Sequence, residues 1–243
     1  MHDPRQHLIV ALDVSSALEA QKIVATLGDS VFSYKVGMQL FTAEGPGIVR
    51  DLVASGRRVF LDLKYHDIPN TVGAAVREAA RLGVSMLTVH ASGGERMLRS
   101  ATEAAGSMNP ELMVLAVTVL TSLADGDLEK LGVYGRVSDQ VLRLAALAIA
   151  NGCQGVVASA KETRELRREL GDAFAIVNPG VRPAGAEHGD QARVVTPAEA
   201  IAAGATHIVV GRPITAAADP AAETRAILAQ IGSSQEPMPA LSK

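Results

Sequence analysis

Eight short runs of apolar, mostly β-branched residues recur along the chain, separated by longer stretches with a helical pattern. They cover residues 7–13, 34–38, 58–64, 86–91, 114–120, 155–160, 175–180 and 207–211. Each run is continuously apolar rather than alternating, which is typical of parallel strands covered on both faces. Eight strand-then-helix units in 243 residues predict an α/β fold, a single-domain (β/α)8 TIM barrel, because an open doubly wound sheet usually has fewer strands.

The stretches between these runs carry signals for helix starts and stops. Ser16 to Glu19 (SALE) and Thr196 to Glu199 (TPAE) both fit a capping box,. Glycines stand where the helices are expected to end, at Gly28, Gly83, Gly152, Gly171 and Gly204,. We expect the barrel to span residues 1–232 and the polar stretch 233–243, which contains Pro and Ser, to be a disordered tail,.

Charge and composition argue against several classes of protein. A formal charge of −3 and a pI near 6.1 lack the basic footprint of nucleic-acid binding proteins. The apolar run LIVAL before Asp13 is too short for a secretory signal or a membrane span,. The single cysteine, Cys153, suits a reducing compartment and a packing role,. We therefore expect a cytoplasmic protein without nucleic-acid or membrane partners.

Barrels of this kind carry their chemistry at the carboxyl ends of the strands. The polar residues expected there are Asp13, Lys35, Asp62, Lys64, His90, Thr121, Ser159, Asn178 and Arg212. Asp62 and Lys64 are two residues apart, so both should face the barrel interior. With Asp13 and Lys35 they can alternate in charge, and each group then keeps its neighbour ionised. A structural ion-pair network remains an alternative, but four charges on three consecutive strands favour catalysis.

The segment HDIPNT follows the third strand and leads into a helix. Spacing alone favours a solvated turn acid at Asp67, three residues beyond Lys64, and a hydrogen-bonded loop histidine at His66. Asn70 or Thr71 is expected to cap the helix.

A phosphate site is expected after the last two strands, because these loops commonly bind phosphate in this fold. Gly211 exposes a backbone N–H there, and Arg212 offers a planar fork suited to phosphate oxygens,. The long loop GVRPAGAEHGDQAR contains Arg182 and Gln191. Long loops at the catalytic end are often lids, so this loop is expected to close over the phosphate.

The block DLKYHDIPNT at residues 62–71 resembles the orotidine 5'-monophosphate decarboxylase family, in its bacterial type. The blocks ALD, YKVGMQLF, VTVLTS, NPGVRP and VGRPIT extend the resemblance, in order, from about residue 8 to residue 230. Tyr65 is a departure, since the family more often has Phe there, but this position should point outward. The resemblance implies decarboxylation of orotidine 5'-monophosphate to UMP, the last step of de novo pyrimidine nucleotide synthesis. It implies no metal or organic cofactor, and a homodimer with shared active sites.

The resemblance also implies roles for individual residues. Lys35, Asp62, Lys64 and Asp67 would surround the reacting carbon, with Asp67 reaching the site of the other subunit. Lys64 would stabilise the C6 carbanion and protonate it. The substrate-binding residues that the resemblance implies are Asp13, Lys35, Ile68, Thr71, Thr121, Arg182, Gln191, Gly211 and Arg212.

Two other functions would use a similar barrel. A Mg²⁺-dependent sugar-phosphate enzyme would need a carboxylate on the second strand, where this chain has Lys35. A catalytically silent nucleotide-binding barrel would keep Gly211 and Arg212 but would have no reason to keep a lysine between two acids. His90 could be a metal ligand, but a lone strand-end histidine more commonly packs or forms a hydrogen bond.

Overall fold

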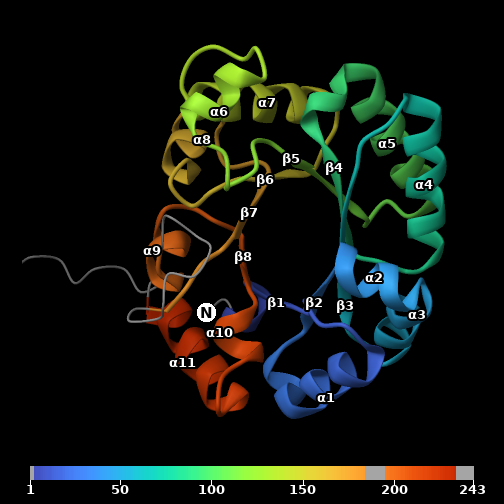
Figure 1. The fold of residues 1–243 in the computed structure, drawn as a ribbon, viewed down its shortest axis with the longest axis vertical. Coiled ribbons are helices and arrows are strands. Elements are labelled where there is room, and N and C mark those ends of the chain that lie inside the picture. Colours follow the sequence, from blue (N-terminus) through green and yellow to red (C-terminus); the bar gives the residue numbers. More distant parts are fainter. Residues whose placement is uncertain (1–2, 184–194, 234–243) are drawn as a thin grey trace, which may run out of the picture.

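The computed structural model describes residues 3–183 and 195–233 of the chain. The described strands form a closed barrel, in which each strand pairs in parallel with the next and β8 pairs with β1. Helices surround this barrel on the outside (Figure 1). The strands are β1 (Leu8–Ala11), β2 (Ser33–Gly37), β3 (Arg58–Tyr65), β4 (Met86–His90), β5 (Met113–Val117), β6 (Gly155–Val157), β7 (Ala175–Pro179) and β8 (His207–Val210). The predicted (β/α)8 barrel is confirmed.

The helices follow the strands as the sequence pattern predicts. They are α1 (Ala17–Leu27), α2 (Met38–Glu44), α3 (Gly47–Ala54), α4 (Pro69–Arg81), α5 (Gly94–Met108), α6 (Asp125–Lys130), α7 (Val137–Ala150), α8 (Thr163–Leu170), α9 (Pro197–Ala202), α10 (Arg212–Thr215) and α11 (Pro220–Ser233), with short 3-10 turns η1 (Pro4–Gln6), η2 (Gly28–Ser30) and η3 (Ala91–Gly93). The five glycines expected at helix ends all have positive φ, between 49° and 105°. Helix α11 extends one residue into the stretch expected to be a tail, and residues 234–243 lie outside the described part of the chain.

The predicted helix starts are confirmed in part. At α9 the capping box is complete, because Thr196 Oγ1 accepts from Glu199 N and Glu199 Oε2 accepts from Thr196 N. At α1 Ser16 caps as expected, but the Glu19 carboxylate accepts from the backbone one residue before Ser16. The expected cap of α4 by Asn70 or Thr71 is wrong, since that helix already begins at Pro69. Proline fits the first helical position because it has no N–H that needs an acceptor.

The apolar core has two parts, separated by the barrel wall. One part lies between the strands and the helices. The other fills the barrel interior with Ile9, Ala11, Phe60, Met86, Leu115, Val177 and Val209. Because strand side chains alternate between faces, the next inward positions beyond Ala11 and Phe60 are Asp13 and Asp62. The charged residues therefore lie on top of an apolar plug.

Strand β3 contains an irregularity at its carboxyl end. Leu61 pairs with Leu87, and the next paired residues are Tyr65 and Val89. Three residues of β3, 62–64, therefore lie opposite a single residue of β4, Thr88. An insertion of two residues preserves the alternation of side chains, and Tyr65 packs against the outer core as expected. Lys64, inside the insertion, has a φ of 53°, the one positive value of a non-glycine residue in the described part of the chain. This conformation costs about 1–2 kcal/mol.

Burial also determines the character of the cysteine, which lies outside the barrel mouth. Cys153 is buried, and desolvation raises the pKa of its thiol to about 12, in agreement with a packing role.

Among the described residues, no helix is long and apolar enough to cross a membrane.

His207, at the start of β8, is expected to make the fold sensitive to acid. Its Nδ1 lies 3.0 Å from Thr206 Oγ1, and burial, with His7 and Arg58 nearby, lowers its pKa to about 4. The unfolded chain, with a His pKa near 6.5, then binds more protons between about pH 4 and 6.5, so stability falls as the pH falls through this window. At pH 5 the loss should be about 2 kcal/mol relative to pH 7.

The check is urea unfolding of the wild type and of His207→Gln at pH 7 and pH 5. The variant should lose less stability on acidification than the wild type does. Equal losses in the two proteins would contradict the assignment to His207.

Candidate active site

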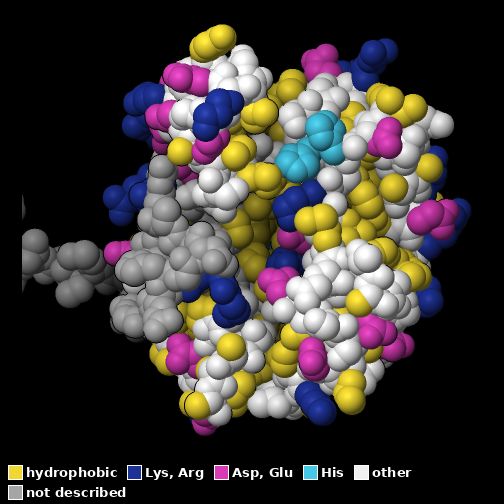
Figure 2. All heavy atoms as spheres, in the orientation of Figure 1, with side chains coloured by type: hydrophobic (Ala, Val, Ile, Leu, Met, Phe, Trp, Pro, Cys, Tyr) yellow, Lys and Arg dark blue, Asp and Glu magenta, His cyan; other side chains and the backbone are white. Residues whose placement is uncertain are grey.

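A cavity of about 440 Å³ opens at the carboxyl ends of the strands. Figure 2 shows basic and acidic side chains gathered in a hollow near the centre of this face. Its polar lining comes from β2, α2 and β3 and from the segments after β1, β7 and β8: Asp13, Lys35, Gln39, Asp62, Arg182, Gly211 and Arg212. The structure thus brings three of the predicted charged residues and the described phosphate-binding candidates to one cavity. Lys64 does not line it but is bonded to Asp62, which does.

Four charged side chains alternate in sign across this mouth. Lys35 Nζ lies 2.8 Å from Asp13 Oδ1 and 3.8 Å from Asp62 Oδ2. Lys64 Nζ lies 2.9 Å from each carboxylate oxygen of Asp62. The Lys35 and Asp62 side chains are only 12% and 14% exposed. Because attraction between opposite charges strengthens away from water, this chain of charges holds both lysines firmly in place.

Three residues at this mouth were not recognised in the sequence. Gly37 leaves room for the first ion pair, because a Cβ there would lie 2.9 Å from Lys35 Nζ. Gln39 lines the cavity and donates a hydrogen bond to Ser15 Oγ. Thr88 is fully buried and donates to Asp62 Oδ1 at 2.9 Å. The sequence did contain a signal for Thr88, because it is a polar residue two positions after Met86, which faces the barrel interior.

Asp67, expected in the site of a second subunit, and the substrate-binding candidates Ile68 and Thr71 do not line this cavity. Asp67, Ile68 and Thr71 are exposed at the start of α4, and Asp67 Oδ1 accepts a hydrogen bond from the Ile68 N–H. Ile68 is 67% exposed, which is unusual for a side chain of its size and polarity,. Two polar side chains and one apolar side chain are thus exposed next to the mouth of the barrel.

Two histidines lie side by side near Lys64. The ring centroids of His66 and His90 are 5.4 Å apart. Burial is the main cause of a lowered pKa for His90, and the nearby charges of His66 and Lys64 lower this pKa further. His90 is therefore neutral at pH 7 and packs against its neighbour, in line with the expectation for a lone strand-end histidine.

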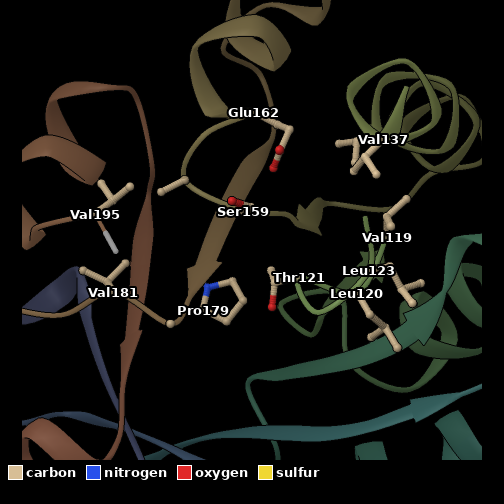
Figure 3. Close-up of a pocket in the computed structure, with 13 residues that line it drawn as sticks. Val119, Leu120, Thr121, Leu123, Val137, Ser159, Glu162, Pro179, Val181 and Val195 are labelled. Carbon is tan, nitrogen blue, oxygen red and sulfur yellow. The ribbon is translucent and has the colours of Figure 1, made fainter. Parts of the chain in front are cut away.

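Thr121 lies in a smaller cavity next to the mouth. Figure 3 shows Thr121, Ser159 and Glu162 around this cavity, with Pro179 and Val181 along one side. Its volume is about 30 Å³, which is room for only one or two water molecules. The two cavities share Pro179, Gly180 and Val181, so Thr121 borders the mouth without lining it.

Asn178 does not reach the mouth at all. Its side chain is fully buried, donates to Ala158 O and accepts from Thr163 Oγ1. The adjacent Val177 faces the barrel interior, so alternation turns Asn178 toward the helices.

The predicted phosphate residues flank one side of the mouth. Gly211 precedes α10, of which Arg212 is the first residue. Arg182 is 8% exposed, and its backbone N–H donates to Val195 O. Gln191 lies outside the described residues. No group of three or more His, Cys, Asp or Glu side chains with metal-binding geometry occurs within residues 3–183 and 195–233.

Comparison with known proteins gives a consistent result. The model of the family described as "Orotidine 5'-phosphate decarboxylase / HUMPS family" matches residues 6–227. An orotidine 5'-phosphate decarboxylase of Halorhodospira halophila is 53% identical over 224 residues, covering 92% of this chain and 95% of that protein. One of Moorella thermoacetica is 51% identical over 233 residues, covering 93% and 92%.

Solved structures agree with these sequence matches. The crystal structure of orotidine 5'-phosphate decarboxylase from Lactobacillus acidophilus is similar with a TM-score of 0.83 and 40% identity, covering 93% of this chain and 99% of that one. The family match and these relatives span nearly the whole chain, including the barrel mouth with its alternating charges. The chain therefore belongs to the orotidine 5'-phosphate decarboxylase / HUMPS family.

Proposed function

We propose that this protein decarboxylates orotidine 5'-monophosphate to UMP without a metal or organic cofactor. The observation that supports this most directly is the unbroken alternation of Asp13, Lys35, Asp62 and Lys64 at the mouth of the barrel. The relatives at about 50% identity are named as decarboxylases of this nucleotide. The charges and the family together favour this reaction.

Electrostatic stabilisation is the main requirement of this chemistry. When the bond between C6 and the carboxylate breaks, CO₂ leaves and the electron pair stays on C6, in an orbital that the pyrimidine ring delocalises poorly. The Lys64 ammonium stabilises this carbanion and then gives C6 a proton. Because Asp62 already holds Lys64 Nζ at 2.9 Å, little reorganisation is needed during the reaction. Asp62, close to the departing carboxylate, favours its loss.

The remaining polar residues bind the rest of the substrate in this proposal. Asp13 and Lys35 hold the ribose hydroxyls, and Thr121 contacts the edge of the pyrimidine. Arg212 and the Gly211 N–H bind the phosphate, supported by Arg182, all three on one side of the 440 Å³ cavity. Gln191, in the loop expected to close, also reaches the phosphate.

A second subunit completes the site in this proposal. Asp67, Ile68 and Thr71 are exposed next to the mouth of their own barrel, where a two-fold axis can bring them to the mouth of the other. In such an isologous interface each subunit gives the same residues to its partner. The protein is then a homodimer with two shared active sites.

The deciding experiment follows the ultraviolet absorbance of orotidine 5'-monophosphate with purified protein in excess chelator. Conversion to UMP is expected. Conversion only after Mg²⁺ is added would favour a metal-dependent reaction instead, although the Lys35 ammonium, 3.8 Å from Asp62, would repel a cation there. Nucleotide binding without conversion would favour a silent binding protein.

Removal of the phosphate from the substrate should lower turnover as well as affinity. Binding energy from a group remote from C6 can drive closure and alignment of the site. With orotidine, kcat at saturation should therefore fall at least about 100-fold. Arg212→Ala should reduce turnover of the nucleotide but add little to the loss seen with orotidine, because both changes remove the same contact. Equal kcat values for the two substrates would contradict this.

A further inference from the structure

We propose that Thr88 is a positioning residue, whose hydroxyl holds both members of the Asp62–Lys64 pair in their reactive geometry. The proposal rests on the proposed function, because it assigns Thr88 a part in that reaction. Thr88 is fully buried on β4 and contacts no bound nucleotide in this scheme. It acts through its two neighbours on β3.

The contacts of the Thr88 hydroxyl support this role. Its Oγ1 donates to Asp62 Oδ1 at 2.9 Å and accepts from the backbone N–H of Lys64, also at 2.9 Å. A hydroxyl has a single proton to donate, and here that proton points at the carboxylate. One side chain therefore links the carboxylate of Asp62 to the backbone of Lys64.

The irregularity in β3 makes such a link necessary. Residues 62–64 lie opposite the single residue Thr88, between the pairs Leu61–Leu87 and Tyr65–Val89. Lys64 adopts a left-handed φ of 53° there, and its N–H donates to the Thr88 side chain instead of a strand carbonyl. The hydroxyl thus replaces the missing acceptor of the sheet and stabilises a backbone conformation that a lysine rarely adopts.

The same hydroxyl also fixes the orientation of the Asp62 carboxylate. Asp62 Oδ1 is held by Thr88, both oxygens are held by Lys64 Nζ, and Oδ2 lies 3.8 Å from Lys35 Nζ. Without the Thr88 hydroxyl, only the two lysines hold the Asp62 carboxylate, so it is free to rotate. The backbone N–H of Lys64 also loses its hydrogen-bond acceptor. Both changes move the ammonium relative to C6, to which catalysis is sensitive.

The test compares Thr88→Val, which removes the hydroxyl at nearly constant volume, with Thr88→Ser, which keeps it. A matched control is Thr118→Val, because Thr118 is also buried and its hydroxyl donates to a backbone oxygen, Val157 O, rather than to a charged side chain. Each variant is assayed for kcat, KM, UMP affinity and melting temperature.

We expect Thr88→Val to lower kcat about 10- to 100-fold, the effect of one hydrogen bond to a charged group. KM and UMP affinity should change less than about threefold. Thr88→Ser should restore most of kcat, and Thr118→Val should keep kcat even if its melting temperature falls as much. A purely structural role would lower the melting temperature of both valine variants without this loss of kcat.

Two outcomes would overturn the proposal in different ways. A Thr88→Val protein with wild-type kcat, or one matched in its loss by Thr118→Val, would overturn the role of Thr88 alone. A wild type that binds UMP but converts no substrate would overturn the proposed function, and the role of Thr88 with it.

Discussion

Replacement of Lys64 by alanine is expected to lower kcat for decarboxylation by at least about four orders of magnitude. The variant loses the cation that stabilises the carbanion and the proton that C6 must receive. Asp62 would still be held by the Thr88 hydroxyl and lie near Lys35, so the barrel mouth should keep its fold. Single-turnover conversion of orotidine 5'-monophosphate, followed by absorbance, measures the loss.

Two controls separate this loss from a general effect of removing a lysine. Lys130→Ala changes a lysine whose side chain is 79% exposed on α6, and it should keep wild-type kcat. UMP affinity of Lys64→Ala should fall far less than its kcat, since ribose and phosphate contacts remain. Residual activity within about tenfold of the wild type would mean that another group supplies the proton.

A mixture of two inactive variants, Asp67→Ala and Lys64→Ala, is expected to recover about a quarter of the wild-type activity. If Asp67 acts in the site of the partner subunit, a mixed dimer has one site with both residues intact and one with neither. Random exchange of subunits makes half of the dimers mixed, and half of their sites active. The measurement is activity against mixing ratio after subunit exchange by mild denaturation and refolding.

The matched control for this experiment mixes Asp62→Ala with Lys64→Ala. Asp62 and Lys64 contact each other within one chain, so no mixed dimer contains an intact pair and activity should stay absent. Recovery in this control, or none with Asp67→Ala, would contradict the shared site.

Much of the fold was predictable because its signals are local. Continuous apolar runs gave all eight strands, and the alternation of side chains brought Asp62 and Lys64 to the mouth. The same rule explains why the expectation that Asn178 lies at the mouth was wrong: this residue is at a strand end, but its side chain is on the outward side of β7. The sequence showed that Asn178 stands at the end of a strand. The face on which its side chain lies became clear only once the structure showed that Val177 points into the barrel.

The parts that were missed depend on pairing between distant segments. Thr88 was overlooked because its partner residues belong to another strand and to an insertion of two residues that no local pattern marks. The start of α4 at Pro69 was misjudged because a capping side chain was sought where proline already removes the donor,. Asp67 could not be assigned from spacing, since its expected target is on another chain.

The alternating charges also affect how substrate arrives. Asp13, Lys35, Asp62 and Lys64 carry two charges of each sign within a few ångströms, so their summed field cancels over distances much longer than the separation of the pairs. Such a centre acts strongly on an atom in contact with it and hardly on a nucleotide still in solution. We expect long-range attraction of the anionic substrate to come from Arg182 and Arg212, which also line the cavity. The ionic strength of the medium should then act mainly on capture of the substrate rather than on bond breaking.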